Sequence, residues 1–263
     1  MRTLVLGCNG QLGQALAETV PKGVELTGLD LPELDITAAG AMQVLVSEVS
    51  PEVIINAAAY TAVDQAESEA ALATAVNSEG PRNIAMAAKT VGARLIHVST
   101  DFVFDGEGTS PYQPDAATNP LSLYGRSKRD GEAAVFDVLP QAATVVRTAW
   151  LYSKTGGNFV KTMLRLMAER DQLSVVGDQR GTPTWASSLA EAVWAMAGRT
   201  DLNGIFHWTD RGDCTWYEFA TAIQEEAISL GLLATAIPIH SISTDEYPTA
   251  AKRPRYSVLD CTA

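Results

Sequence analysis

Residues 1–13 read Met1-Arg-Thr-Leu-Val-Leu-Gly-Cys-Asn-Gly-Gln-Leu-Gly13, an apolar run that leads directly into three spaced glycines. The run at 2–6 is expected to be a short buried strand of a parallel sheet, and the glycines open an amphipathic helix that ends near Val20. Glycines in such a turn let a pyrophosphate approach the free N–H groups of the helix N-terminus. The stretch predicts a dinucleotide site, in preference to a plain tight turn, formed by Gly7, Gly10, Gln11, Leu12 and Gly13.

Strand and helix patterns alternate over the first 150 residues. Strands are expected at 24–29, 52–56, 94–99 and 143–147, and helices at 38–49, 80–91 and 124–137. This alternation predicts an α/β fold, a Rossmann-like doubly wound parallel sheet. Thr37 is a candidate N-cap for the helix at 38–49.

Beyond residue 150 the alternation becomes irregular. Helices are expected at 158–170, 187–197 and 215–230, and short strands at 173–176 and 205–208. Thr215 and Glu218 form a capping-box pattern, and Trp216, Phe219 and Ile223 are interpreted as core. We expect a dinucleotide-binding domain over 1–150 and a smaller, mainly substrate-binding portion over 151–263 that is interleaved with the first.

The residues that follow the predicted strands are candidates for further cofactor contacts. The carboxyl ends of parallel strands share one edge of the sheet, where ligands bind. Asp30 is suited to hold an adenosine ribose, although a strand-end Asp can also simply cap a turn. Its charge repels a 2′-phosphate and favours NADH over NADPH. The other predicted contacts at this edge are Asp35, Ile36, Ala57, Ala58, Ala59, Tyr60 and Thr61.

Tyr124 and Lys128 lie four residues apart near the start of a predicted helix, so their side chains share one face. A free tyrosine has a pKa near ~10, and a neighbouring ammonium group is expected to lower it until the phenol serves as an acid. The same spacing occurs by chance on ordinary helices. It gains weight here from the dinucleotide pattern and from the hydroxyl of Thr100, which precedes it.

The composition restricts the classes of partner and compartment. The formal net charge is −12 and the pI about 4.7, which disfavours nucleic acid and anionic membranes as partners. Three widely spaced cysteines, Cys8, Cys214 and Cys261, are expected to be free thiols in a reducing compartment. No apolar run approaches the ~20 residues that span a bilayer, so a cytoplasmic location is expected.

The glycine turn, Ser99-Thr-Asp101 and Tyr124-x-x-x-Lys128 together resemble the extended short-chain dehydrogenase/reductases. Within that superfamily the chain is most similar to the dTDP-4-dehydrorhamnose reductases. The similarity runs almost from end to end and is carried by Gly10-Gln-Leu-Gly13, Asn56-Ala-Ala-Ala-Tyr-Thr-Ala-Val-Asp64 with Glu67, Ser99-Thr-Asp-Phe-Val-Phe-Asp-Gly106, Arg147-Thr-Ala-Trp150, Asn158-Phe-Val-Lys-Thr-Met163, Asp178-Gln-Arg-Gly-Thr-Pro-Thr184 and Arg253-Pro-Arg-Tyr-Ser257.

The resemblance implies that NADPH or NADH reduces the C4 ketone of dTDP-4-dehydro-L-rhamnose. In that scheme Tyr124 donates the proton and Thr100 hydrogen-bonds the ketone oxygen. Lys128 holds the nicotinamide ribose and lowers the pKa of the phenol. The implied contacts to the nucleotide sugar are Asp101, Trp150, Asn158, the turn at 179–184 and Arg253.

The chain departs from the family pattern at two places. Gln14-Ala15 stands where the family often carries a Glu that helps to bind Mg²⁺ between two subunits. This difference disfavours a Mg²⁺-bridged dimer, so we predict no metal ligand and either a monomer or a homodimer. The chain also stops soon after Ser257, where relatives usually continue into a further helix.

Three alternative functions are weighed. Sugar-nucleotide dehydratases carry an Asp-Glu pair after the Thr, whereas Phe102 follows Asp101 here, which favours simple reduction. A ketoreductase that forms the other C4 epimer would use the same residues and stays open. So does a non-catalytic role, because some members of this group resemble regulatory subunits of a methionine adenosyltransferase.

Overall fold

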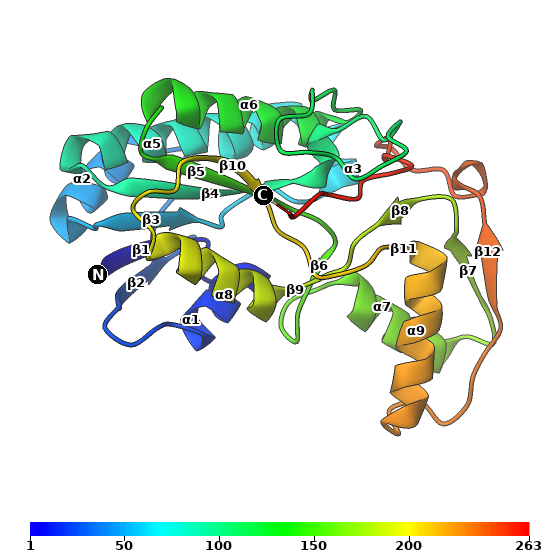
Figure 1. Cartoon of the computed structure of the whole chain (residues 1–263). Coiled ribbons are helices and arrows are strands. Elements are labelled where there is room, and N and C mark those ends of the chain that lie inside the picture. Colours follow the sequence, from blue (N-terminus) through cyan, green and yellow to red (C-terminus); the bar gives the residue numbers. More distant parts are fainter. Residues whose placement is uncertain (263) are drawn as a thin grey trace.

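A computed structural model describes residues 1–262 and shows one parallel sheet between two layers of helices (Figure 1). Its strands follow one another in the order β10-β5-β4-β3-β1-β2, and every pairing is parallel. The predicted doubly wound sheet is confirmed. Its strands are β1 (Arg2–Leu6), β2 (Glu25–Leu29), β3 (Val53–Asn56), β4 (Arg94–Thr100), β5 (Ala143–Thr148) and β10 (Gly204–His207).

Both faces of the sheet are buried, because side chains alternate along each strand and meet helices on either side. Leu4 and Leu6 pack toward α2, α5 and α6, whereas Val5 between them packs toward α1 and α8. Figure 1 shows these two helical layers above and below the strands. The covering helices are α1 (Gln11–Glu18), α2 (Ala39–Val49), α5 (Gly80–Val91), α6 (Leu123–Val138) and α8 (Ala186–Ala197).

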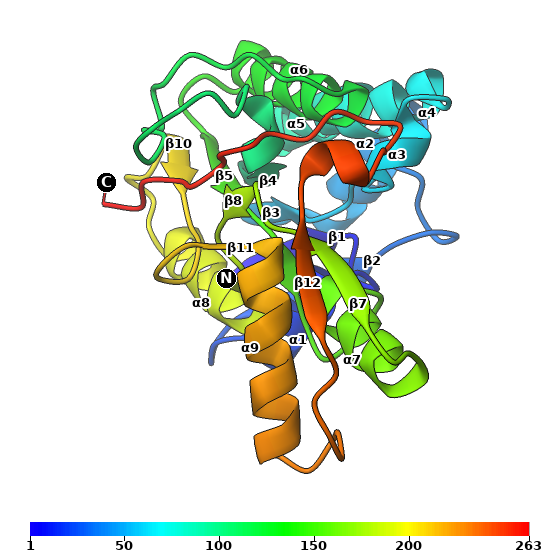
Figure 2. The same cartoon turned by 90° about the vertical axis from the view of Figure 1, so that its right-hand side faces the viewer.

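A smaller lobe with its own apolar core lies beyond the carboxyl edge of the sheet. There α7 and α9 pack against each other beside the parallel pair β7–β12 (Figure 2). The predicted capping box at Thr215 and Glu218 is present at the start of α9. The elements after β5, apart from α8 and β10, are β6 (Leu151–Tyr152), α7 (Phe159–Glu169), β7 (Leu173–Val176), β8 (Arg180–Gly181), β9 (Thr184–Trp185), β11 (Cys214–Thr215), α9 (Trp216–Ser229) and β12 (Ile239–Ile242).

The two halves of the chain exchange segments. α8 and β10 belong to the second half in sequence but lie with the large sheet, and the segment 247–262 returns to the first half. Arg253 in that segment forms an ion pair with Asp64 at 2.6 Å. Asp64 belongs to α3, which is one of the short helical segments that connect the main elements. These connecting segments are α3 (Val63–Ala66), α4 (Ala70–Thr74), a π-helical turn (Ala75–Glu79) and two 3₁₀ turns (Asp101–Val103 and Thr244–Glu246). The division at residue 150 stays a prediction.

Thr37 does not cap α2. The helix begins one residue later, with Ala38 as its N-cap and no side chain in the capping role. The Thr37 hydroxyl and backbone N–H both donate to the Asp35 carboxylate instead, at 2.8 Å each. The Thr37 hydroxyl, which the sequence pattern assigned to the helix N-terminus, therefore forms part of a local Asx-type turn with Asp35. Within residues 1–262, no helix combines the length and apolarity that crossing a membrane requires.

A buried ion pair joins α6 to the sheet. Arg147 on β5 donates from two nitrogens to the carboxylate of Glu132, and both side chains are about 95% shielded from water. Ser99 at the end of β4 donates to the same carboxylate. The bidentate geometry satisfies charges that would otherwise be costly to bury. This contact places α6, which carries Tyr124 and Lys128, against the strand ends.

We expect the Glu132→Ala substitution to lower the free energy of unfolding by about 3–5 kcal/mol, because it leaves Arg147 buried and unpaired. Urea denaturation would measure the loss. The matched control is Glu169→Ala, which breaks an exposed pair with Arg165 and should change stability little. Equal losses in the two variants would contradict a structural role for the buried pair.

Candidate active site

A cavity of about 170 Å³ lies where the strand order reverses, at the carboxyl ends of β1, β2 and β3. Chains of this topology bind ligands at such a reversal, because the two flanking loops run in opposite directions and leave a crevice. The lining contains eight of the predicted cofactor residues, namely Gly7, Gly10, Asp30, Asp35, Ile36, Ala57, Ala58 and Ala59.

The glycine turn is tightly packed, and side chains would not fit at two of its positions. Gly7 has a φ of +83°, and a Cβ there would lie 2.6 Å from the Ala58 nitrogen. A Cβ on Gly13 would lie 2.2 Å from the Gly7 carbonyl oxygen. Gly10 is the N-cap of α1 and offers no side chain to the first N–H groups. These features fit a dinucleotide whose pyrophosphate approaches the helix end directly.

Asp30 faces the same cavity with its carboxylate held in place. One oxygen accepts the Asn9 backbone N–H at 2.9 Å and the other accepts that of Leu31 at 2.8 Å. Among the described residues, the lining includes a second carboxylate, Asp35, but neither Lys nor Arg. The electrostatic environment therefore suits ribose hydroxyl groups better than a 2′-phosphate.

The other predicted cofactor residues lie outside this cavity. Leu12 is buried against the sheet, and Gln11 accepts hydrogen bonds from Ser153 and Asn158 in the second half of the chain. The Tyr60 hydroxyl donates to Glu69, and Thr61 is exposed. Sequence position alone did not separate residues that border the crevice from those that support it.

The predicted catalytic residues form one buried group at the ends of β4 and α6. Tyr124, Thr100 and Lys128 are 9%, 6% and 2% exposed. Ser122 caps α6 by accepting the Gly125 N–H, which places Tyr124 in the first turn. Phe102 packs edge-on against the Tyr124 ring, with centroids 5.7 Å apart. The side chain of Thr100 lies close enough to the phenol to affect its ionisation.

The expected lowering of the Tyr124 pKa is wrong for this structure. The pKa of Tyr124 is raised to about 12, mainly by burial; the Thr100 hydroxyl opposes the increase and the charge of Asp101 adds to it. The pKa of Lys128 is lowered to about 8, mainly by burial and against the opposing charge of Glu132. The Lys128 ammonium group donates to the Val98 carbonyl oxygen at 2.7 Å. Desolvation therefore outweighs the attraction between phenolate and ammonium that the spacing suggested.

Asp101 lies beside these residues and is 2% exposed. Burial raises its pKa to about 6, although Ser257 and Thr100 hold it lower than burial alone would. The Thr100 hydroxyl donates to one Asp101 oxygen at 3.0 Å and accepts the Phe102 N–H at 3.2 Å. The other Asp101 oxygen has no hydrogen-bond partner within residues 1–262.

A second cavity, of about 570 Å³, lies between the strand ends and the smaller lobe. Two predicted substrate contacts, Trp150 and Arg253, line it, together with Gln179 of the predicted polar turn. Several other lining residues were not predicted from the sequence as part of the site, and they include Phe102, Phe159, Arg170, Trp216 and Tyr247. Trp216 was interpreted as core, but it is half-buried and borders the cavity. Its helical spacing resembles that of a core residue, so only tertiary packing reveals the difference.

Asn158 is not among the residues that line this cavity. Its side chain accepts the Lys161 N–H as the N-cap of α7 and donates to Gln11 at 3.0 Å. The residue therefore joins α7 to the first helix and does not contact the cavity directly. Arg253 borders the cavity, but its guanidinium group is already paired with Asp64. No group of three or more His, Cys, Asp or Glu side chains within 1–262 is arranged to hold a metal ion.

Comparisons with known proteins place this geometry in a family. A family model described as "RmlD substrate binding domain" matches residues 1–263. The "dTDP-4-dehydrorhamnose reductase" of Streptomyces griseus is 45% identical over 98% of this chain and 85% of its own length. A "Probable dTDP-4,6-dihydroxy-2-methyloxan-3-one 4-ketoreductase" of Streptomyces antibioticus is 41% identical over 98% and 86%.

Among solved structures, dTDP-4-dehydrorhamnose reductase from Bacillus anthracis, in complex with NADP, superposes with a TM-score of 0.94 at 40% identity. The match covers 99% of this chain and 90% of that one. Sequence and structural similarity therefore extend over both the dinucleotide crevice and the smaller lobe. The chain belongs to the RmlD family of dTDP-4-dehydrorhamnose reductases.

Proposed function

We propose that this protein uses NADH or NADPH to reduce the C4 ketone of dTDP-4-dehydro-L-rhamnose to dTDP-L-rhamnose. The observation that carries the proposal is the buried group of Tyr124, Thr100 and Lys128 at the same sheet edge as the dinucleotide crevice. Phe102 contacts the Tyr124 ring and also lines the larger cavity, which links that group to a space large enough for a nucleotide sugar. The names of the relatives support the same reaction.

The reduced nicotinamide, when bound, supplies a hydride to the C4 carbon. Tyr124 supplies the proton that the developing alkoxide needs, and its phenol is a stronger acid than the alcohol being formed. A pKa of about 12 keeps the phenol protonated at neutral pH, so the proton is present before the hydride moves. The resulting phenolate recovers its proton from water.

Thr100 and Lys128 assist at fixed positions. The single hydroxyl proton of Thr100 points at Asp101, so it reaches the ketone oxygen only when the hydroxyl rotates or Asp101 carries a proton. The Lys128 ammonium group is anchored on the Val98 carbonyl and has two further N–H groups to offer to ribose hydroxyls. A negative charge that develops on the phenol strengthens its attraction to this ammonium group.

The remaining parts of the proposal concern partners and location. The acidic net charge disfavours nucleic acid and anionic membranes as partners. An anionic nucleotide sugar needs local cationic groups, and Arg170 and Arg253 line the larger cavity. We propose a cytoplasmic monomer or homodimer. The Streptomyces antibioticus relative, named as a 4-ketoreductase of a different sugar, favours a related 4-ketoreductase as the second candidate function.

The direct test combines purified protein, NADH or NADPH and enzymatically prepared dTDP-4-dehydro-L-rhamnose. We expect oxidation of the cofactor and an NMR spectrum of the product with the C4 configuration of L-rhamnose. A product with the opposite configuration would favour the second ketoreductase reading. Unchanged absorbance of the reduced nicotinamide would contradict an enzymatic role and leave the non-catalytic subunit.

We expect the Tyr124→Phe substitution to lower kcat by about 10²–10³-fold, because the proton donor is lost while the ring and its packing remain. The dissociation constant of the cofactor should change less than about twofold, a small effect in free energy. The matched control is Tyr152→Phe, which removes a phenol hydroxyl from the smaller lobe and should retain normal turnover. Near-normal turnover of Tyr124→Phe would assign the acid to another residue.

Asp30 predicts a preference for NADH over NADPH of at least about tenfold in kcat/KM, the effect of one unfavourable charge contact. Asp30→Asn should narrow that preference, since it removes the charge while keeping an acceptor for the backbone. Glu33→Gln is the control, because Glu33 belongs to the same loop but does not line the crevice. Faster turnover with NADPH in the unsubstituted protein would contradict the prediction.

A further inference from the structure

We propose that Trp216 and Gly181 are positioning residues that hold Trp150 in the conformation in which it lines the larger cavity. The inference rests on the proposed function, since Trp150 is a predicted contact of the nucleotide sugar. It assigns a role to Trp216, which starts α9 and lies outside the predicted site. It also gives Gly181, which lies on β8 within the predicted turn at 179–184, a supporting role in place of direct contact.

Trp150 adopts an unfavourable backbone conformation. Its φ is +45°, and Ser50 is the only other non-glycine residue with a positive φ among residues 1–262. The left-handed region brings Cβ close to the following carbonyl oxygen, so a tryptophan stays there only when its surroundings hold it. Trp150 follows β5 at the carboxyl edge of the sheet, where strained residues commonly serve a binding site.

The contacts that hold this side chain come from distant parts of the chain. The Trp150 and Trp216 indoles stack with centroids 3.4 Å apart and planes inclined by 9°. Phe159 packs on Trp216 from α7, at 4.6 Å. Gly181 packs against the Trp150 indole so closely that a Cβ there would lie 2.6 Å from it. Trp216 thus supports the ring, and Gly181 leaves the space that the ring occupies.

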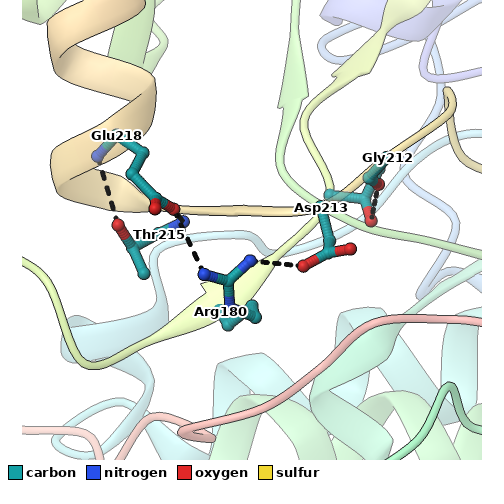
Figure 3. A network of polar contacts seen from close by, with 6 residues as sticks. Arg180, Gly212, Asp213, Thr215 and Glu218 are labelled. Atoms are coloured by element: carbon teal, nitrogen blue, oxygen red, sulfur yellow. Dashed lines mark hydrogen bonds and ion pairs between the residues drawn. The ribbon is translucent and has the colours of Figure 1, made fainter.

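A polar network fixes Trp216 and Gly181 relative to each other. β8 and β11 pair in register, with Gly181 opposite Cys214 and Arg180 opposite Thr215. Figure 3 shows the Arg180 guanidinium group between the carboxylates of Asp213 and Glu218. Thr215, immediately before Trp216, and Glu218, two residues after it, form the capping box of α9. The network therefore anchors both supports of Trp150 to one rigid unit.

The effect that Gly181 and Trp216 have by positioning Trp150 can be distinguished from direct contact with a ligand. Gly181 does not line the cavity, so a methyl group added there acts on the ligand only by displacing the Trp150 ring. Trp216 does line the cavity, so a substitution there could also remove a direct contact with the ligand. Its effect must therefore also be measured in a protein in which Trp150 has already been truncated. If Trp216 acts by holding Trp150, its removal has little further effect once Trp150 has been truncated.

The test measures steady-state kinetics with the sugar nucleotide and far-UV circular dichroism of the free protein. Trp216→Leu and Gly181→Ala should each raise the KM for the sugar nucleotide about tenfold, the loss of one aromatic contact, while the cofactor dissociation constant stays within about twofold. Trp216→Phe, which keeps a flat ring, should restore KM to within about threefold. In a Trp150→Ala background, Trp216→Leu should add less than about a twofold change.

Phe219→Leu is the matched control, because Phe219 lies on the same face of α9 but outside the cavity lining. It should lower the melting temperature without raising KM. Stacked indoles give an exciton signal in circular dichroism, which should disappear in both Trp150→Phe and Trp216→Phe. This signal can be measured without turnover. A protein that shows the signal but has no activity would therefore contradict the proposed function while leaving the stacking of the two indoles intact.

Any one of the following outcomes would overturn the proposal. One is a multiplicative effect of Trp216→Leu in the Trp150→Ala background, which would mean that Trp216 contacts the ligand independently. A second is an unsubstituted protein that turns over the sugar nucleotide but lacks the exciton signal. A third is a Gly181→Ala variant whose KM equals that of the unsubstituted protein. Equal effects of Phe219→Leu and Trp216→Leu on KM would likewise reduce the role to general packing.

Discussion

Parallel pairing of the six central strands brings all of their carboxyl ends to one edge, and every part of the site depends on this arrangement. The glycine turn follows β1, Asp30 follows β2, and Ala57–59 follow β3. Thr100 ends β4, and Trp150 lies just beyond β5. A reduction needs a cofactor, an acid and a carbonyl within contact distance. In a parallel sheet, residues that follow neighbouring strands lie close together, so this proximity results from the strand pairing itself.

Burial sets the ionisation of the reacting groups more strongly than their mutual charge. Tyr124, Lys128 and Asp101 are each pushed toward the neutral form, which is the general effect of a low-dielectric environment. Neutral phenol is the form that an acid needs before hydride transfer. The buried Arg147–Glu132 pair, in contrast, keeps both of its charges, because a bidentate contact satisfies them. The same interior thus holds a structural ion pair and a neutral donor side by side.

The larger cavity is assembled from segments that are distant in sequence. Phe102 follows β4, Phe159 comes from α7, Trp216 from α9 and Arg253 from the returning segment near the end of the chain. The Phe159–Trp216 contact joins α7 to α9, and the Trp150–Trp216 stack joins α9 to the end of β5. The Asp64–Arg253 pair joins the returning segment to α3. A change in any one segment therefore alters the shape of the wall that a nucleotide sugar would meet.

The sequence alone determined the strands of the large sheet and the edge at which ligands bind, because apolar periodicity and spaced glycines are local properties of the chain. It predicted α5 from residue 80 to 91 and the capping box of α9, both as observed. It did not reveal the raised pKa of Tyr124, the cavity role of Trp216 or the turn of Asn158 toward Gln11. Those depend on desolvation and on contacts between segments far apart in sequence, so only the tertiary structure decided them.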